Sequence, residues 1–524
     1  MPSASLGATT AASAPVAAPA APVTPAAVGG RNAMPVASAP LAGTASSTPA
    51  ISPAAVPPTA AGAPALAPSP ARAGASAAAS AGAAAGATAL PAAAGSGSVA
   101  PAAAPSGPLF PANGAKDICP DVSLHLFFDA APSLGSSGKI SVFSQSGSAV
   151  AVVDMATTQV SETVGGVQLQ QPRPVLVRDR EVVVRLPKRL DYGQEYYVTV
   201  DASAIKSAGA GMTLTDKNAW RFSTRSGPPS DASKLRVALD GSGDFCSVQG
   251  ALDATPARGA KTEIDIGPGT YFELVHASGK SNVTLRGADR KRTVILGTNN
   301  DNLNGGTAKR ALVSIDGSQN IQIEQLTIHN LTPQGGSQAE ALRLDKCEQC
   351  VVRHADILSL QDTLLWTGRI YANDCYIEGN VDFVWGYGAA YFDKCEIKTV
   401  GRAGYVVQAR NMPGAGGYVF VDSKITAGSG ISKIVLARID AAEYGGSQVA
   451  YVNCQMGDHI APEGWTVTGG GGSGLRFWEY QSTNASGAPL DVSRRHAASK
   501  QISADQAQKL RDPAQFFGGW NPPR

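Results

Sequence analysis

A recurrence of about 20 residues is the feature of this sequence that most constrains its fold. The segments QAEAL, LQDTLL and VDFVWG follow one another between Gln338 and Gly386. Gln361 comes 23 residues after Gln338 (361 − 338), and Asp382 comes 20 residues after Asp362 (382 − 362). A recurrence of this size indicates a solenoid whose repeats stack as successive coils. Residues one period apart then lie about 4.8 Å from each other on one face of a parallel sheet. Two amides and two carboxylates would share a small patch.

The C-terminal part of the chain, residues 228–524, predicts a right-handed parallel β-helix. Its segments are short, rich in Val, Ile and Tyr, and separated by Asn, Gly and Asp, with no long helical periodicity. A leucine-rich repeat would need an LxxLxLxxN core, which is absent here. A short helix near Val248 is expected to cap the N-terminal end. The expected strands cover residues 262–266, 282–285, 293–296, 321–328, 350–353, 369–376, 390–397, 418–425 and 450–456.

Two further regions precede this domain in an all-β chain. Residues 109–227 contain short alternating segments with Gly, Asp and Ser turns, which predict an immunoglobulin-like β-sandwich. It contains no catalytic cluster, so a spacer or docking module is expected. Residues 1–108 are dominated by Ala, Pro, Gly, Ser and Thr, and they predict a disordered arm. The expected sandwich strands cover residues 122–128, 139–143, 181–186, 196–200 and 220–224.

Charge and hydropathy exclude several classes of partner. The 43 basic and 41 acidic residues nearly balance, which gives no reason to expect a nucleic-acid partner. No apolar stretch is long enough to span a membrane. Met1 does not lead into a basic patch and an apolar core, so no ordinary signal peptide is expected. Closed solenoid ends predict a monomer.

The seven cysteines raise two questions. Cys375 and Cys395 lie one coil apart, so they could stack and form a disulfide, which would favour an oxidising compartment and secretion. Cys347 and Cys350 form a CxxC without a second pair at zinc-finger spacing. Two core or turn thiols are therefore expected there, rather than a zinc or redox site.

The recurring polar residues suggest acid–base and nucleophilic chemistry. A carboxylate beside an arginine stays ionised and can attack a carbonyl carbon. A second carboxyl in a drier site keeps its proton and can act as a general acid. Glutamine N–H groups can stabilise an oxyanion. Glycosidases also use two carboxylates, so the pair alone leaves ester hydrolysis and glycoside hydrolysis both open.

Five motifs in a fixed order carry a resemblance to a known family. Over roughly residues 235–520 the chain resembles the pectin methylesterases, and residues 109–227 resemble bacterial Ig-like domains. The resemblance implies a secreted or cell-surface enzyme that demethylates galacturonate esters of pectin, with no cofactor and no metal. The motifs are GTYFE at 269–273, QAEAL at 338–342, QDTL at 361–364, DFVWG at 382–386 and LAR at 436–438.

The same resemblance implies a role for each residue of the patch. Asp382 is the expected nucleophile, and Asp362 is the expected general acid and base. Gln361 is the expected oxyanion donor, and Gln338 is expected to contact the substrate or the oxyanion. Arg438 is expected to orient Asp382 and keep it charged. Taken singly, a Gln can belong to a structural ladder and an Asp can serve as a turn residue.

Further substrate contacts are expected beside the patch. Phe383 and Trp385 are two residues apart on one strand, which predicts that they share a face. Stacking on sugar rings and packing in the core are both open for them. Thr307, in the polar segment NGGTAKR, is also expected to contact substrate.

The sequence also departs from the family pattern. It has LARID where family members read LGRPW, so Asp440 replaces an aromatic residue, and Leu360 and Leu365 stand where tyrosines are common. An added carboxylate disfavours free galacturonate, so highly methylated pectin or another ester is expected as substrate. The alternatives are an esterase or thioesterase on another acyl substrate, and a non-catalytic carbohydrate-binding surface protein. A polysaccharide lyase is disfavoured because the acidic cluster typical of its calcium site is absent.

Overall fold

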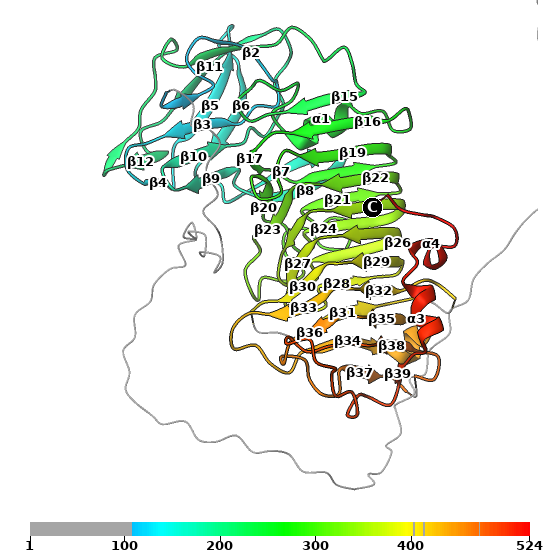
Figure 1. The fold of residues 1–524 in the computed structure, drawn as a ribbon. Helices are drawn as coiled ribbons and strands as arrows, with labels where there is room; N and C mark the ends of the chain where they lie inside the picture. Colours follow the sequence, from blue (N-terminus) through cyan, green and yellow to red (C-terminus); the bar gives the residue numbers. More distant parts are fainter. Residues whose placement is uncertain (1–106, 402–403, 412–413, 471, 524) are drawn as a thin grey trace, which may run out of the picture. The chain divides into compact units, whose positions relative to one another are not determined.

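The computed structural model describes residues 107–524, apart from 402–403, 412–413, 471 and 524. The predicted arm, except for its last two residues, lies outside the described residues. The described part belongs to one compact unit (Figure 1). Within it, no helix is long and apolar enough to cross a membrane.

The first described segment forms the predicted β-sandwich. One sheet has the strand order β1-β3-β10-β9 and is antiparallel, and a five-stranded sheet has the order β2-β14-β11-β5-β6. Alternating apolar residues of both sheets, such as Val182 of β10 and Val198 of β11, fill a common core, because successive strand residues face opposite sides. The strands are β1 (Leu109–Phe110), β2 (Ala115–Ile118), β3 (Leu124–Phe127), β4 (Pro132–Leu134), β5 (Lys139–Ser144), β6 (Ala149–Asp154), β9 (Val175–Arg178), β10 (Glu181–Val184), β11 (Glu195–Val200), β12 (Ile205–Ser207), β13 (Ala210–Gly211) and β14 (Arg221–Thr224).

The second segment is the predicted parallel β-helix, in which every strand pairs in parallel with strands of neighbouring coils. Each coil contributes strands to three series. The first series comprises β15 (Lys234–Val237), β16 (Thr262–Ile266), β19 (Ser281–Gly287), β22 (Gln319–Glu324), β24 (Leu342–Arg353), β26 (Leu364–Asn373), β29 (Ala389–Asp393), β32 (Tyr418–Val421), β35 (Gln448–Val452), β38 (Arg476–Tyr480) and β39 (Ser499–Gln501).

The second and third series run beside the first (Figure 1). The long strands β24 and β26 belong to the first series with their C-terminal halves and to the second with their N-terminal halves. The second series also has β18 (Val275–Ser278), β21 (Val313–Asp316), β28 (Val384–Gly386), β31 (Tyr405–Ala409), β34 (Val435–Asp440) and β37 (Trp465–Thr468). The third has β17 (Gly269–Phe272), β20 (Thr293–Gly297), β23 (Thr327–Asn330), β25 (Asp356–Leu358), β27 (Tyr376–Gly379), β30 (Glu396–Thr399), β33 (Lys424–Ala427) and β36 (Gln455–Met456).

A sharp corner separates the first series from the third in successive coils. One residue at each corner has a left-handed backbone, with φ between 49° and 59°. Asn and Asp tolerate this conformation better than most residues. The corner breaks the predicted strands at 321–328, 369–376, 390–397, 418–425 and 450–456 into two each, so their continuity was wrongly predicted. The corner residues are Gln325, His354, Asp374, Lys394, Asp422 and Asn453.

The interior of the β-helix is a stack of apolar side chains in register. The rings of Phe392 and Phe420 lie 4.5 Å apart, and those of Phe420 and Tyr451 lie 4.7 Å apart. Cys375 and Cys395 occupy stacked core positions, but both thiols are free. The disulfide that the sequence suggested between them is therefore not formed. Each thiol instead donates a hydrogen bond to a backbone carbonyl. Cys347 and Cys350 are free and buried, as core thiols.

The sandwich also contributes to the N-terminal end of the β-helix. Helix α1 (Val248–Ala254) packs there as predicted, and the carboxylate of Glu273 accepts hydrogen bonds from its first two N–H groups. Hairpin β7 (Gln159–Val164) and β8 (Val167–Pro172) belongs to the sandwich segment of the chain. Its Val164 and Leu169 nevertheless lie in the core of the β-helix. The sandwich segment thus shares a core with the β-helix, and its role as a spacer or docking module stays a prediction.

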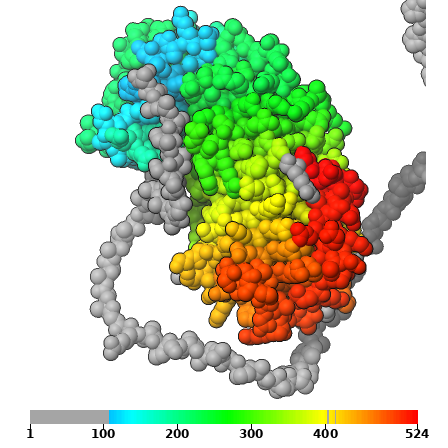
Figure 2. Space-filling model, in the orientation of Figure 1, coloured from blue at the N-terminus to red at the C-terminus, as the bar shows by residue number. Residues whose placement is uncertain are grey.

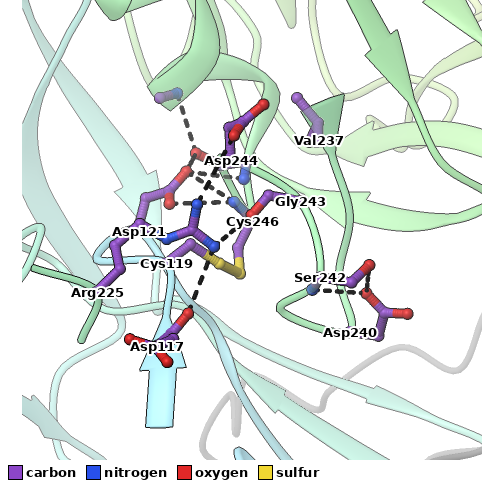
Figure 3. The surroundings of a disulfide bond; sticks show 12 residues. Asp117, Cys119, Asp121, Arg225, Val237, Asp240, Ser242, Gly243, Asp244 and Cys246 are labelled. Atoms are coloured by element: carbon purple, nitrogen blue, oxygen red, sulfur yellow. Dashed lines mark hydrogen bonds and ion pairs between the residues drawn. A yellow bond between two sulfur atoms is a disulfide. The ribbon is translucent and has the colours of Figure 1, made fainter. Parts of the chain in front are cut away.

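A disulfide between Cys119 and Cys246 joins the two segments covalently (Figure 3). Beside it, the carboxylate of Asp121 accepts hydrogen bonds from the backbone N–H groups of Cys246 and Ser247. Arg225 of the sandwich donates to the Gly243 carbonyl at 2.6 Å. The disulfide and these polar contacts fix the sandwich to the first coil.

The C-terminal residues cover the outer face of the first series. Apolar side chains of α3 (Ala504–Leu510) and α4 (Pro513–Phe516) and the following Phe517 pack on outward-facing Tyr391 and Val419. Figure 2 shows this segment in red against the yellow and orange coils. The site described below lies along the second series, where the described C-terminal helices do not pack.

Candidate active site

Asp362 and Asp382 occupy equivalent positions in neighbouring coils. Each comes two residues before a strand position, and these positions, Leu364 and Val384, pair in register. Both aspartates have a left-handed backbone, with φ of 65° and 50°. Asp is one of the few residue types that adopt this conformation readily. Both aspartates thus occupy turn positions, which was the alternative for each taken singly, and they also lie one coil apart, as the period of the sequence predicts.

Asp382 is paired with Arg438, as the sequence predicted. The guanidinium reaches across from β34, donating from Nε to Oδ1 at 2.8 Å and from Nη2 to Oδ2. This bidentate contact raises the pKa of Arg438, and the Asp382 side chain is only 5% exposed. The ring of Tyr405 lies under the Arg438 guanidinium at 4.8 Å, and its backbone carbonyl accepts from the Asp382 N–H. Tyr405 thus supports both members of the pair.

Asp362 is surrounded by several charged groups. Burial, and next the negative charge of Glu340, raise the pKa of Asp362 from 3.8 to about 8, and Asp382 adds to the rise. Arg310 and Arg410 oppose it. Arg310 donates to Oδ2 of Asp362 at 2.9 Å. The surroundings of the two aspartates therefore differ: burial and negative neighbours favour the protonated form of Asp362, whereas Asp382 is held by the Arg438 guanidinium.

The two glutamines lie at the edge of the same patch, and both are partly exposed. Gln361 directly precedes Asp362, and within the described part of the chain no group bonds to its side-chain amide. The Gln338 side-chain oxygen accepts from Ser337 at 2.8 Å, and its backbone carbonyl accepts from the N–H of Asp301. The side-chain NH₂ groups of both glutamines are unused by the described residues.

Phe383 and Trp385 do not share a face. Phe383 is fully buried in the core of the β-helix, so core packing is the correct interpretation for it, and contact with substrate is not. Trp385 lies on the site side, with the guanidinium of Arg410 at 4.9 Å from its ring and that of Arg310 at 5.7 Å. Phe383 precedes β28, in the turn that the left-handed Asp382 makes, so the alternation of side chains along a strand does not apply to it and the prediction failed.

Two other predicted contacts have different surroundings. Asp440 is the N-cap of the short helix α2 (Ala441–Tyr444), and its carboxylate accepts from the Ala442 N–H at 3.0 Å. Thr307 is exposed in the loop between β20 and β21. The side chain of Asn304 in this loop makes two hydrogen bonds with the Gln170 backbone of β8.

Four site residues were not predicted from the sequence: Arg310, Glu340, Tyr405 and Arg410. Glu340 could have been found, because it lies one coil before Asp362 (362 − 340 = 22) and within the quoted QAEAL motif. Arg310 could not, because its position depends on how the loop after β20 folds back.

This arrangement places Asp382, which is paired with an arginine, next to a buried carboxyl whose pKa is raised, beside amide donors that no described residue engages. Such an arrangement suits acyl transfer from an ester. Residues 234–519 match the family model for pectinesterase, and residues 107–224 match that for the bacterial Ig-like domain. The first match covers more than half of the chain.

The chain belongs to the pectinesterase family. It is 33% identical to pectinesterase 31 of Arabidopsis thaliana over 218 residues, which are 39% of this chain and 68% of that protein. It is 31% identical to pectinesterase 2 of Olea europaea over 291 residues, which are 53% of this chain and 77% of that protein. The structure of the carrot pectin methylesterase matches with a TM-score of 0.50 and 26% identity, covering 57% of this chain and 95% of that one. Members of the pectinesterase family and this chain thus share the β-helix.

Proposed function

We propose that this protein is a pectinesterase that hydrolyses the methyl esters of galacturonate units in pectin to free carboxylates and methanol. Its membership in the pectinesterase family supports this substrate. The observation that carries the proposal is the contrast between Asp382, which is paired with Arg438, and Asp362, whose pKa is raised to about 8. One carboxylate can attack while the other carboxyl donates a proton.

In the proposed reaction, the Asp382 carboxylate attacks the ester carbonyl carbon. Asp362 gives its proton to the methoxide oxygen as that C–O bond breaks, and methanol leaves. The remaining acyl group is an anhydride with Asp382. The Asp362 carboxylate then takes one proton from water, whose oxygen attacks the acyl carbon. The anhydride C–O bond breaks, which releases the Asp382 carboxylate and the galacturonic acid, and the acid then loses its proton to solvent. The overall change is ester plus water to acid plus methanol.

The glutamine amides are the proposed donors to the oxyanion that forms in both steps. Gln361 adjoins Asp362 and has an amide that no described residue engages. Gln338 retains its NH₂ group because only its side-chain oxygen is bonded. N–H donors aimed at a developing negative charge are typically worth a factor of about 10²–10³ in rate.

An aromatic and cationic surface beside the carboxyls supports a polyuronate substrate. The ring of Tyr387, 42% exposed, lies edge-on between Trp385 and Tyr444, with 6.3 Å between ring centroids on each side. Arg410 donates to Tyr387 Oη at 3.4 Å, and it has no carboxylate partner in the described part of the chain. Asp440 is the N-cap of the helix that carries Tyr444, and its carboxylate accepts a hydrogen bond from the backbone of that helix. We propose that Tyr387 and Tyr444 supply the aromatic surface that LARID lacks.

We further propose that the protein is a secreted or cell-surface monomer. The Cys119–Cys246 disulfide supports an oxidising compartment, in place of the Cys375–Cys395 pair expected earlier. A concentration-independent mass in light scattering is the expected result for a monomer.

Methanol release from highly methylated pectin tests the proposed function. The full chain is the appropriate protein, since a disulfide and a shared core join the sandwich to the β-helix. Release by the full chain and its loss in Asp382→Ala and in the isosteric Asp382→Asn would support both the reaction and the nucleophile. Hydrolysis of aryl esters or thioesters without methanol release would favour a different acyl substrate. Inactivity in every assay would favour a non-catalytic carbohydrate-binding protein.

A further inference from the structure

A buried group of charges lies directly behind Asp362. Arg310 has a side chain that is 8% exposed, and that of Glu340 is fully buried. Arg310 Nε donates to both oxygens of Glu340 at 3.0 Å, and Nη2 donates to Glu340 Oε1 at 2.7 Å. Nη1 donates to Asp301 at 3.1 Å. The same Nη2 donates to Asp362 Oδ2 at 2.9 Å, so one nitrogen bridges the two carboxyls.

The register of the coils explains why these groups meet. Glu340 and Asp362 each lie two residues before Leu342 and Leu364, which pair in register. They therefore stand one above the other on the same series, and Arg310 comes from the loop that precedes β21. Removing one charge from such a buried group lowers the stability of the fold if it leaves an opposite charge buried without a partner.

The number of carboxyl groups that contact Arg310 decides how strongly its positive charge lowers the pKa of Asp362. A guanidinium that served Asp362 alone would favour the ionised form. Here the single positive charge faces Glu340 and Asp301 as well. Burial raises the pKa of Glu340, and its hydrogen bonds and charge contact with Arg310 oppose that rise. A guanidinium has only donors, so it must contact an unprotonated oxygen of Asp362, which is Oδ2. The proton of Asp362 then belongs on Oδ1, where no described residue donates.

We infer that Glu340 and Arg310 are a positioning pair for Asp362: Arg310 holds Oδ2, and Glu340 offsets the guanidinium charge so that Oδ1 keeps the proton. This inference rests on the proposed role of Asp362 as the general acid. The other charged groups that face Asp362 are Asp382 in the following coil, its partner Arg438 from β34, and Arg410. Each of these remains in place when Glu340 is changed.

The test is the pH dependence of kcat for methanol release by Glu340→Gln in the full chain. Gln keeps the shape of the side chain but leaves the Arg310 charge facing Asp362, and it removes the repulsion by Glu340. This change lowers the pKa of Asp362. Because the reaction needs Asp362 in its protonated form, the loss of activity on the alkaline side then begins at a lower pH than in the wild type. The alkaline limb of the profile is expected to move down by at least about one unit, the shift usual for a carboxyl beside an arginine. Below the limb, kcat is expected to be retained.

Two further variants separate a positioning role from a structural one. Glu324→Gln is a matched control, because Glu324 is also a buried carboxylate held by two guanidiniums, those of Arg286 and Arg353. Its profile is expected to superimpose on the wild type. The double variant Arg310→Gln with Glu340→Gln removes both charges, and its alkaline limb is expected to lie above that of Glu340→Gln.

The outcomes distinguish this inference from the proposed function. Absence of methanol release by the wild-type protein would overturn the proposed function, and the inference with it. Normal release with an unmoved alkaline limb in Glu340→Gln would overturn the inference alone. If Glu340→Gln fails to fold, the double variant decides. A limb that lies at the wild-type position or higher would then support the offsetting of charges, and a limb below it would contradict it.

Discussion

Replacing Asp362 by Asn is expected to stabilise the folded protein while it removes activity. The pKa of Asp362 is about 8 in the folded protein, against 3.8 for an ordinary aspartate. At pH 7 the unfolded chain ionises this group, whereas the folded protein retains the proton. The difference of 3.2 units (7 − 3.8) corresponds to on the order of 4 kcal/mol in favour of unfolding the wild type. Asn has no proton to lose, so this term is absent in the variant.

The sign of the effect predicts how it changes with pH. Below about pH 4 the carboxyl is protonated in both the folded and the unfolded states, so the advantage of Asp362→Asn disappears. As pH rises from 4 to 8, the unfolded state binds fewer protons than the folded state, and the wild type loses stability. Above pH 8 the folded state ionises too, so the advantage stays constant at its largest value.

Thermal unfolding of the full chain at pH 4, 7 and 9 measures this. With an unfolding entropy of about 2.1 cal/mol/K per residue over roughly 400 residues, 4 kcal/mol raises Tm by about 5 °C at pH 7. Asp179→Asn is the matched control, because Asp179 is exposed and has the same left-handed backbone, with φ of 50°. It reports what Asn contributes at such a position without the buried charge.

Two results would refute the reasoning. One is a Tm for Asp362→Asn at pH 7 that is no higher than the wild type after correction for the Asp179→Asn control. The other is an advantage that is equally large at pH 4 and pH 7. Methanol release by Asp362→Asn should also fall, by a factor of about 10²–10⁴ if the residue is the general acid and base.

Three other changes test separate parts of the structure. Arg438→Ala leaves the buried Asp382 without its bidentate partner, and kcat for methanol release should fall at least about a hundredfold; an unchanged kcat would show that the pair is not needed. Tyr387→Ala removes an exposed ring, so KM for methylated pectin should rise about fivefold, roughly 1 kcal/mol, with kcat retained; a fall in kcat alone would argue against a binding role. Cys119→Ser with Cys246→Ser opens a link across 127 residues and should lower the free energy of unfolding by about 2–5 kcal/mol in denaturant titration, whereas equal stability would mean that the non-covalent contacts suffice.

Much of the fold follows from local patterns in the sequence. Short Val- and Ile-rich segments separated by Asn and Asp predict stacked parallel strands, and the β-helix and β-sandwich confirm this. The strand ends were less accurate, because a single left-handed residue such as Asp374 or Asp422 turns the chain between sheets without any change in composition. Periodicity detects the coil and does not detect its corner.

The candidate site shows the same division. Asp362, Asp382 and Arg438 were predicted because the coil spacing and the motifs mark them. Phe383 was misplaced because it precedes β28, in the turn at Asp382, and the rule of alternation holds only within a strand. Arg310 was missed because it reaches Glu340 and Asp362 from a loop, 30 and 52 residues away in sequence.

By itself, the sequence determined the coil period, the apolar interior and the two aspartates one coil apart, since these depend on spacing along the chain. Only the tertiary structure decided which groups surround Asp362, which aromatic residue faces the site and which cysteines are bonded. Burial and charge pairing act between groups that are near in space, and the pairing of Cys119 with Cys246 depends on how two segments dock. Such proximity arises from the fold as a whole, so no local pattern in the sequence records it.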